Sequence, residues 1–222
     1  MTRPSPASSR KRVRLALLAV TTVLAATSLL FAPRSSALEE LAGEKGALKS
    51  CEERICLMLL QKNPKGADLR CDLTKTWAQS TIRAAESRTV RWGFGDARCS
   101  VKLDITRAQI VLAMTEREFK FHAPAHTADC VVEEGGVLKP LKATLAPKIV
   151  FRDGQASKVW INLINIEGSA AIRDTLRTAA QLEDSFGLFH RPIIKSINRF
   201  IYRHCPKSYP QALSDPPRSP RG

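Results

Sequence analysis

The sequence lacks the short motifs that mark most common catalytic and cofactor-binding sites. It has no P-loop and no G-x-G-x-x-G segment, so neither of the usual glycine-rich phosphate loops is present. It has no G-x-S-x-G nucleophile elbow, so no serine is marked as the nucleophile of a hydrolase. Aromatic residues make up only 6% of the chain, and they alternate with apolar residues rather than with Lys and Arg. This pattern argues against nucleic acid as a partner.

The N-terminal residues have the order of a secretory signal peptide. Four positive charges lie within residues 10–14, an uncharged apolar run covers residues 15–31, and small residues at 35–37 suit a cleavage site. We therefore expect residues 1–37 to be removed and the protein to be exported, either to a periplasm or out of the cell. The alternative is an uncleaved single-span anchor, because the apolar run is near the minimum length that crosses a bilayer.

The six cysteines all follow this segment, and they contain no C-x-x-C pair of the kind that binds zinc. An even number in an exported chain predicts three disulfides and no free thiol. Cys51 and Cys56 are five residues apart in a predicted helix, so their side chains point about 140° apart and should not bond to each other. We expect Cys99 to pair with Cys130, because both open strands that can lie side by side. The predicted disulfide residues are Cys51, Cys56, Cys71, Cys99, Cys130 and Cys205.

The charge of the chain is basic but scattered. The formal net charge is +14, and six of the 35 basic residues lie in residues 1–37, which leaves +8 after cleavage. A scattered excess of this size predicts a solvated basic surface that favours anionic partners, rather than a nucleic-acid groove.

The clearest strand pattern covers residues 138–166, where apolar and polar side chains alternate on both sides of Asp153-Gly154. A two-residue loop at this point would place the apolar faces out of register. We therefore predict a three-residue loop at 153–155 with Gly154 at positive φ. A bulge or strand end is expected between Leu163 and Ile164, where the alternation slips. The predicted cross-strand pairs are Ile149 with Val159 and Phe151 with Ser157.

The remaining segments predict an α+β domain over residues 38–205. We expect a curved antiparallel sheet of about five or six strands, packed on one face by N- and C-terminal helices and stapled by disulfides. Residues 206–222 contain five prolines and predict a disordered tail. Further strands are predicted at 69–73, 99–105, 110–114, 119–121 and 130–132, and helices at 48–59, 74–85, 169–187 and 192–204.

Three aromatic residues are candidates for a ligand pocket: Trp92, Phe94 and Trp160. The first two lie in a glycine-rich loop, which could line a pocket or could cover the core. The helix at 192–204 carries an apolar stripe opposite basic residues. It predicts either a helix docked on the sheet, which we favour, or peripheral contact with an anionic membrane.

His122 and His126 are the best candidates for metal ligands or catalytic groups, but Pro124 between them disfavours the helix that would bring them together. We expect no cofactor and no metal. The sequence thus favours an exported, non-catalytic binding or structural protein that could hold an apolar ligand between sheet and helices. A small hydrolase or metal-dependent enzyme using the two histidines is one alternative. An inhibitor or adaptor that binds a protein through the hairpin edge is another.

Overall fold

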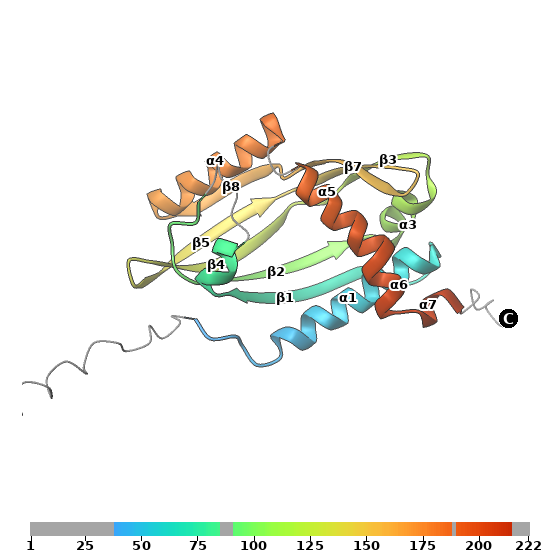
Figure 1. Ribbon diagram of the computed structural model, residues 1–222, viewed down its shortest axis with the longest axis horizontal. Coiled ribbons are helices and arrows are strands. Elements are labelled where there is room, and N and C mark those ends of the chain that lie inside the picture. Colours follow the sequence, from blue (N-terminus) through green and yellow to red (C-terminus); the bar gives the residue numbers. More distant parts are fainter. Residues whose placement is uncertain (1–37, 85–90, 188–189, 215–222) are drawn as a thin grey trace, which may run out of the picture. The chain divides into compact units, whose positions relative to one another are not determined.

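The computed structural model describes residues 38–84, 91–187 and 190–214, which form a mixed α+β fold (Figure 1). Five antiparallel strands form a larger sheet in the order β1-β2-β4-β5-β8, and three form a smaller sheet in the order β3-β6-β7. The predicted α+β class is confirmed, although the described residues form eight strands in two sheets. The curvature of the sheet and its covering by helices on one face stay predictions. The strands are β1 (Leu69–Trp77), β2 (Ala97–Ile105), β3 (Glu118–His122), β4 (His126–Glu134), β5 (Val137–Leu145), β6 (Lys148–Arg152), β7 (Gln155–Trp160) and β8 (Leu163–Gly168).

The helices precede, interrupt and follow these strands. One long helix begins the described chain, two short ones follow β1 and β2, and the rest come after β8. They are α1 (Glu44–Gln61), α2 (Gln79–Ala84), α3 (Arg107–Thr115), α4 (Ala170–Phe186), α5 (His190–Arg199), the π-helix η1 (Phe200–His204), α6 (Cys205–Ser208) and α7 (Gln211–Ser214).

The middle of the larger sheet has an apolar side and a polar side, as its register shows. A row of directly paired residues crosses all five strands and is entirely apolar. The next row along the strands points to the opposite face and is entirely polar. The apolar row is Leu73, Val101, Ala128, Ala143 and Ile166, and the polar row is Thr74, Ser100, Asp129, Lys142 and Glu167.

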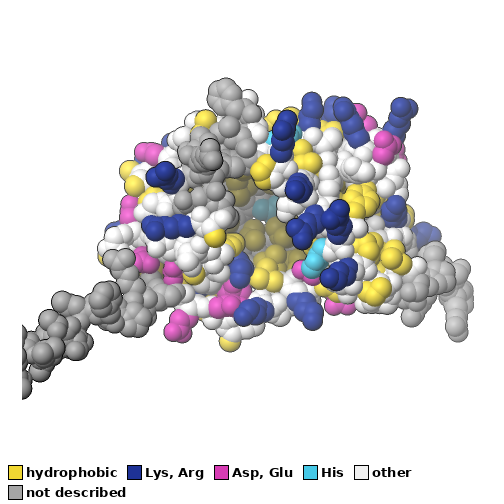
Figure 2. Space-filling view, in the orientation of Figure 1, with side chains coloured by type: hydrophobic (Ala, Val, Ile, Leu, Met, Phe, Trp, Pro, Cys, Tyr) yellow, Lys and Arg dark blue, Asp and Glu magenta, His cyan; other side chains and the backbone are white. Residues whose placement is uncertain are grey.

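Two buried clusters pack at different parts of this apolar face. The first joins α1, α3 and the C-terminal helices to β1 and the smaller sheet, and the second joins α4 to β4, β5 and β8. Leu73, Val101, Ala128 and Ala143 are only half-buried. Figure 2 shows a hollow beside α5 with hydrophobic side chains on its floor and Lys and Arg on its α5 side.

The long hairpin predicted over residues 138–166 is divided between the two sheets. Ala146-Pro147 separates β5 from β6, and Ile161-Asn162 separates β7 from β8. Asn162 has φ 49°, a left-handed conformation that asparagine tolerates better than most residues. The predicted irregularity at Leu163 and Ile164 is confirmed, because β5 and β8 change register there and leave Ile164 without a direct partner.

The predicted three-residue loop in this hairpin is wrong. Arg152 pairs with Gln155, so the turn has two residues, Asp153 and Gly154, with φ of 50° and 78° as a type I′ turn requires. The predicted Ile149–Val159 pair is confirmed, but Phe151 pairs with Ala156 instead of Ser157. A register shift between Val150 and Phe151 brings the apolar side chains of β6 and β7 back onto the same face of the sheet. The extra residue is therefore accommodated by a bulge, not by the loop.

Gly154→Val should destabilise the protein more than Gly136→Val. Both glycines have positive φ, which resists a β-branched residue and costs about 1–3 kcal/mol. A Cβ on Gly154 would also lie 2.7 Å from Tyr202 Oη and 3.3 Å from Met114 Cε, whereas one on Gly136 has nothing within 4 Å. Urea denaturation of both variants measures the difference, and equal losses would show that the contacts around Gly154 are not those described.

Two other predicted elements are wrong. Residues 110–114 are not a buried strand but part of α3, which begins after Thr106 because the Thr106 hydroxyl accepts a hydrogen bond from Gln109 N–H. Thr74 and Thr76 do not cap a helix, since β1 continues to Trp77, which pairs with Ala97. The helix that follows is the short α2, and residues 85–90 lie outside the described chain.

The predicted disulfides are confirmed. Cys99 pairs with Cys130, and the other two bridges are Cys51–Cys71 and Cys56–Cys205. The helix predicted at 169–187 is also confirmed, with the Ser169 hydroxyl accepting from Ile172 N–H at its start.

Residues 206–214 are not a disordered tail. They form most of α6 and all of α7, with Tyr209 and Ala212 buried and both helices in contact with α1. Residues 215–222 and the predicted signal peptide at 1–37 lie outside the described chain. Within the described ranges, no helix is both long and apolar enough to cross a membrane.

Candidate functional site

An apolar cavity of about 420 Å³ lies between the smaller sheet, α1, α3 and the C-terminal helices. Aromatic side chains of β3 and β6 form one side of the cavity, and apolar side chains of α5 and η1 form the opposite side. Eleven of its twelve lining residues are apolar, and Ser196 is the exception. The lining residues are Ile55, Leu59, Ile105, Ile110, Ala113, Phe121, Ile149, Phe151, Ser196, Ile197, Phe200 and Ile201.

The helix that borders this cavity is attached to the edge of the smaller sheet. The Asn198 side chain accepts a hydrogen bond from Ala156 N–H at 2.8 Å and donates one to the Ala156 carbonyl at 2.9 Å. A single amide thus satisfies both backbone groups of one residue on the edge strand β7, which would otherwise be open to pairing. The contact fixes the height of α5 above the sheet.

The far end of the same helical segment is fixed to α1. The Cys56–Cys205 disulfide joins them, and both cysteines are fully buried. Beside it, Glu52 Oε1 lies 2.7 Å from His204 Nε2 and accepts a hydrogen bond from the Tyr209 hydroxyl at 3.1 Å. The helical segment that borders the cavity is therefore fixed at two points, at Asn198 to the smaller sheet and at Cys205 to α1.

The polar side of this helix points away from the cavity. Lys195, Arg199 and Arg203 are exposed, while Ile197 and Phe200 are half-buried and Ile201 is buried. Ser196 is exposed and also lines the cavity, so it lies at the cavity's rim. The apolar interior of the cavity thus lies beside a positively charged surface.

The three aromatic pocket candidates do not come together. Trp92 and Phe94 are edge to face with ring centroids 5.0 Å apart, and they belong to the second buried cluster. Trp92 Nε1–H donates to the Gly95 carbonyl at 2.7 Å, which supports the core-covering alternative. Trp160 lies on the smaller sheet, where it lines a separate cavity with His122. Ligand contact by any of the three stays a prediction.

The two candidate metal ligands also have different environments. His126 Nε2 accepts from Asp104 N–H at 3.0 Å, which assigns the proton to Nδ1, and Nδ1–H then donates to the Pro124 carbonyl at 2.7 Å. Both ring nitrogens are therefore occupied by backbone groups. His122 is exposed and lines the separate cavity. In the described part of the chain, no group of three or more His, Cys, Asp or Glu side chains could hold a metal ion.

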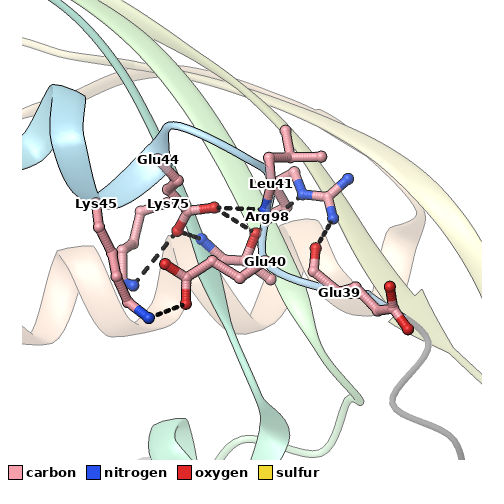
Figure 3. Close-up of polar contacts among 8 residues, drawn as sticks. Glu39, Glu40, Leu41, Glu44, Lys45, Lys75 and Arg98 are labelled. Atoms are coloured by element: carbon pink, nitrogen blue, oxygen red, sulfur yellow. Dashed lines mark hydrogen bonds and ion pairs between the residues drawn. The ribbon is translucent and has the colours of Figure 1, made fainter.

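Three carboxylates are buried within the described ranges, and each contacts a residue from another segment of the chain. Asp96 accepts from Gln79 N–H at 2.8 Å and from Leu38 N–H at 3.4 Å. Glu183 Oε1 lies 3.6 Å from His190 Nδ1. Glu44 lies at the start of α1 and accepts hydrogen bonds from β1 (Figure 3).

Glu44 has the clearest electrostatic signature of the three. Burial alone raises the pKa of its carboxyl group. Hydrogen bonds from Thr76 N–H at 2.6 Å, the Thr76 hydroxyl at 2.9 Å, Leu41 N–H and the Lys75 ammonium lower it further than burial raises it. The net result is a pKa below the ordinary 4.5. The charged form is thus stabilised by folding, as expected of a carboxylate that joins α1 to β1.

Acid should therefore weaken the fold through Glu44. The pKa of Glu44 is lower in the folded state than in the unfolded state. Its contribution to the free energy of unfolding is therefore complete at pH values above the pKa of the unfolded state, and it is lost as the pH falls through the pKa of the folded state. We expect the difference in unfolding free energy between wild type and Glu44→Gln to shrink between about pH 7 and about pH 3. Urea titration at both values measures it. A difference that does not change with pH would contradict the described hydrogen bonds.

The sequence predicted an apolar ligand between sheet and helices but not the residues that line the cavity, because these come from separate segments that each resemble ordinary core. The stripe at 192–204 was the one available signal. Comparisons with protein-family models, with curated proteins and with solved structures find no match to the chain.

Proposed function

We propose that the protein binds an elongated aliphatic ligand, such as a fatty acyl chain, in the cavity between the smaller sheet and the helices. The observation that carries the proposal is the composition of the cavity, with eleven apolar lining residues and one serine in about 420 Å³. Ligand sites of this size are usually apolar with few polar groups, and packed cores contain few voids larger than a water molecule.

The composition of the lining supports a flexible apolar ligand over a polar one. Six of the lining residues are isoleucines, and the only side-chain polar atom among the twelve belongs to Ser196 at the rim. No set of donors and acceptors converges inside that would orient a polar molecule. Discrimination would come from length and shape, as expected for an acyl chain whose polar end stays outside.

The surroundings also fit a ligand of this class. Three disulfides suggest an oxidising compartment, in agreement with the signal peptide predicted from the sequence. The exposed Lys195, Arg199 and Arg203 suit an anionic head group or an anionic lipid surface near the rim. The enzyme alternative receives less support, because His126 is already bonded to the backbone through both ring nitrogens.

Filling the rim should block binding. We expect wild type to bind a fluorescent fatty acid saturably and Ser196→Trp to bind it at least tenfold more weakly, since an indole would occupy the space of the chain. Ser50→Trp is the matched control, because Ser50 is an exposed helical serine on α1 that does not line the cavity.

The two variants separate occupancy of the cavity from general effects of a surface tryptophan. Equal affinity of wild type, Ser196→Trp and Ser50→Trp would place the fatty acid elsewhere and contradict the proposal. Absence of any saturable binding by wild type would also contradict it. The melting temperature of each variant verifies that the comparison is made on folded protein.

A further inference from the structure

The outer face of the smaller sheet gathers cationic side chains beside a tryptophan. His122 pairs directly with Lys148, and Lys148 pairs directly with Trp160, so these three form one row across β3, β6 and β7. Lys120 pairs with Val150 in the next row of the same face. Directly paired side chains lie about 4.5–5.5 Å apart at Cβ and diagonal ones about 7–8 Å apart. Both lysines and the imidazole can therefore reach one small ligand.

These residues line a second cavity of about 460 Å³. Val150 is buried beneath them, and Trp160 is half-buried at its side, with its ring 6.4 Å from that of His190. Ile149 lines both this cavity and the apolar one, but none of the other lining residues is shared. The second cavity is thus a different chemical environment. Its lining residues are Lys120, His122, Lys148, Ile149, Val150, Trp160, Asn162 and Asp184.

The one acidic residue in this lining is engaged with the backbone. Asp184 Oδ1 accepts from Ile161 N–H at 2.7 Å, and Asp184 Oδ2 accepts from Asn162 N–H at 3.0 Å. These bonds hold the connection between β7 and β8 and offset part of the carboxylate's charge. Neither Lys120 nor Lys148 forms an ion pair with any residue of the described ranges. The cavity therefore presents two ammonium groups that have no ion-pair partner within the described ranges.

We propose that this cavity binds a small organic anion of the phosphate monoester class, with a ring that lies against Trp160. Two flexible ammonium groups act as point charges that suit the several oxygens of a phosphate. The two lysines lie on the neighbouring strands β3 and β6, so both ammonium groups can reach the same phosphate. The tryptophan and the buried valine supply an apolar wall for the body of the ligand. This site is independent of the fatty-acid cavity.

The fluorescence of Trp160 provides a direct readout. The chain has three tryptophans, so Trp77→Phe with Trp92→Phe leaves Trp160 as the only reporter. In this background, titration with phenyl phosphate should change the emission saturably. Inorganic phosphate lacks the ring and phenol lacks the charge, so we expect each to bind at least about tenfold more weakly than phenyl phosphate.

A charge-matched pair of variants tests the two lysines. Lys120→Ala with Lys148→Ala should weaken binding of phenyl phosphate at least about tenfold, because both ammonium contacts are lost. Lys102→Ala with Lys139→Ala removes the same charge from exposed positions of the larger sheet and should change the affinity less than about twofold. The phosphorus NMR signal of phenyl phosphate gives a second readout that does not depend on tryptophan.

Several results would overturn the proposal. No saturable change with phenyl phosphate in either readout would do so, as would equal weakening by the two double variants, which would show a general charge effect. Benzoate binding as tightly as phenyl phosphate would contradict the phosphate class. These results are distinct from failure of fatty-acid binding, because the two cavities share only Ile149 among their lining residues.

Discussion

Replacing Cys56 and Cys205 together by serine is expected to lower the free energy of unfolding by about 4–5 kcal/mol, the largest loss of any bridge in the protein. The two cysteines are separated by 149 residues, so their bond restricts most of the unfolded chain, and both are fully buried. Two buried hydroxyl groups would replace the bridge and would add a desolvation cost. Urea denaturation under non-reducing conditions measures the loss.

The bridge between Cys51 and Cys71 is the matched comparison. It spans 20 residues, and in the same chain-entropy account its removal should cost about 3 kcal/mol. A larger loss for the short bridge than for the long one would contradict this account. Thiol labelling of denatured, unreduced wild type should find no reactive cysteine, because all six are paired.

Ile201→Ala is expected to cost about 2–5 kcal/mol, from lost transfer free energy and an enlarged cavity. Ile201 is 5% exposed and belongs to the first buried cluster. Leu112→Ala is a suitable control, because Leu112 is 38% exposed on α3 and should cost much less. Thermal or urea unfolding of both variants gives the two values.

The same variant separates core packing from membrane attachment. Ile197 and Phe200 are half-buried against the cluster, so their truncation should cost less than that of Ile201. If instead Ile201→Ala unfolded like wild type and lost binding to anionic liposomes, the apolar side of the helix at 192–204 would face lipid. Lys195→Glu with Arg199→Glu then tests the electrostatic part, since each basic residue near an anionic surface contributes about 1 kcal/mol.

Local signals in the sequence predicted much of the fold. The alternation of apolar and polar residues at 99–105 predicted β2. Ser169 predicted the start of α4, and Gly187, which has φ 63°, predicted its end. The Cys99–Cys130 pair followed from two strands that each begin near a cysteine. In each case, the residues that determine the structure are close together in the chain.

The errors arose where distant residues decide the outcome. Residues 110–114 are apolar at successive positions, which fits a buried strand, but α1 and the smaller sheet surround the segment and can bury a helix on several sides. The hairpin at 138–166 is divided because its outer half pairs with β3, whereas its inner half pairs with β4 and belongs to the larger sheet. Residues 206–214 pack because Cys205 holds them next to α1. None of these partners is visible in the local pattern.

The candidate site was predictable only in outline. The sequence predicts an apolar ligand between sheet and helices, with Trp92, Phe94 and Trp160 as the candidate lining residues. The indole N–H of Trp92 is instead bonded to Gly95, and the cavity is lined mainly by aliphatic residues from the helices and strands, together with Phe121, Phe151 and Phe200. An apolar lining residue and an apolar core residue have the same sequence signature. The distinction requires the three-dimensional packing.

Native mass spectrometry of the protein purified from its own compartment tests the central claim most directly. We predict that wild type and Ser50→Trp carry a bound aliphatic species that is absent from Ser196→Trp, because the indole fills the rim of the cavity. Wild type that carries no such species, and that takes none up when incubated with a fatty acid, would contradict the claim that the cavity is a ligand site.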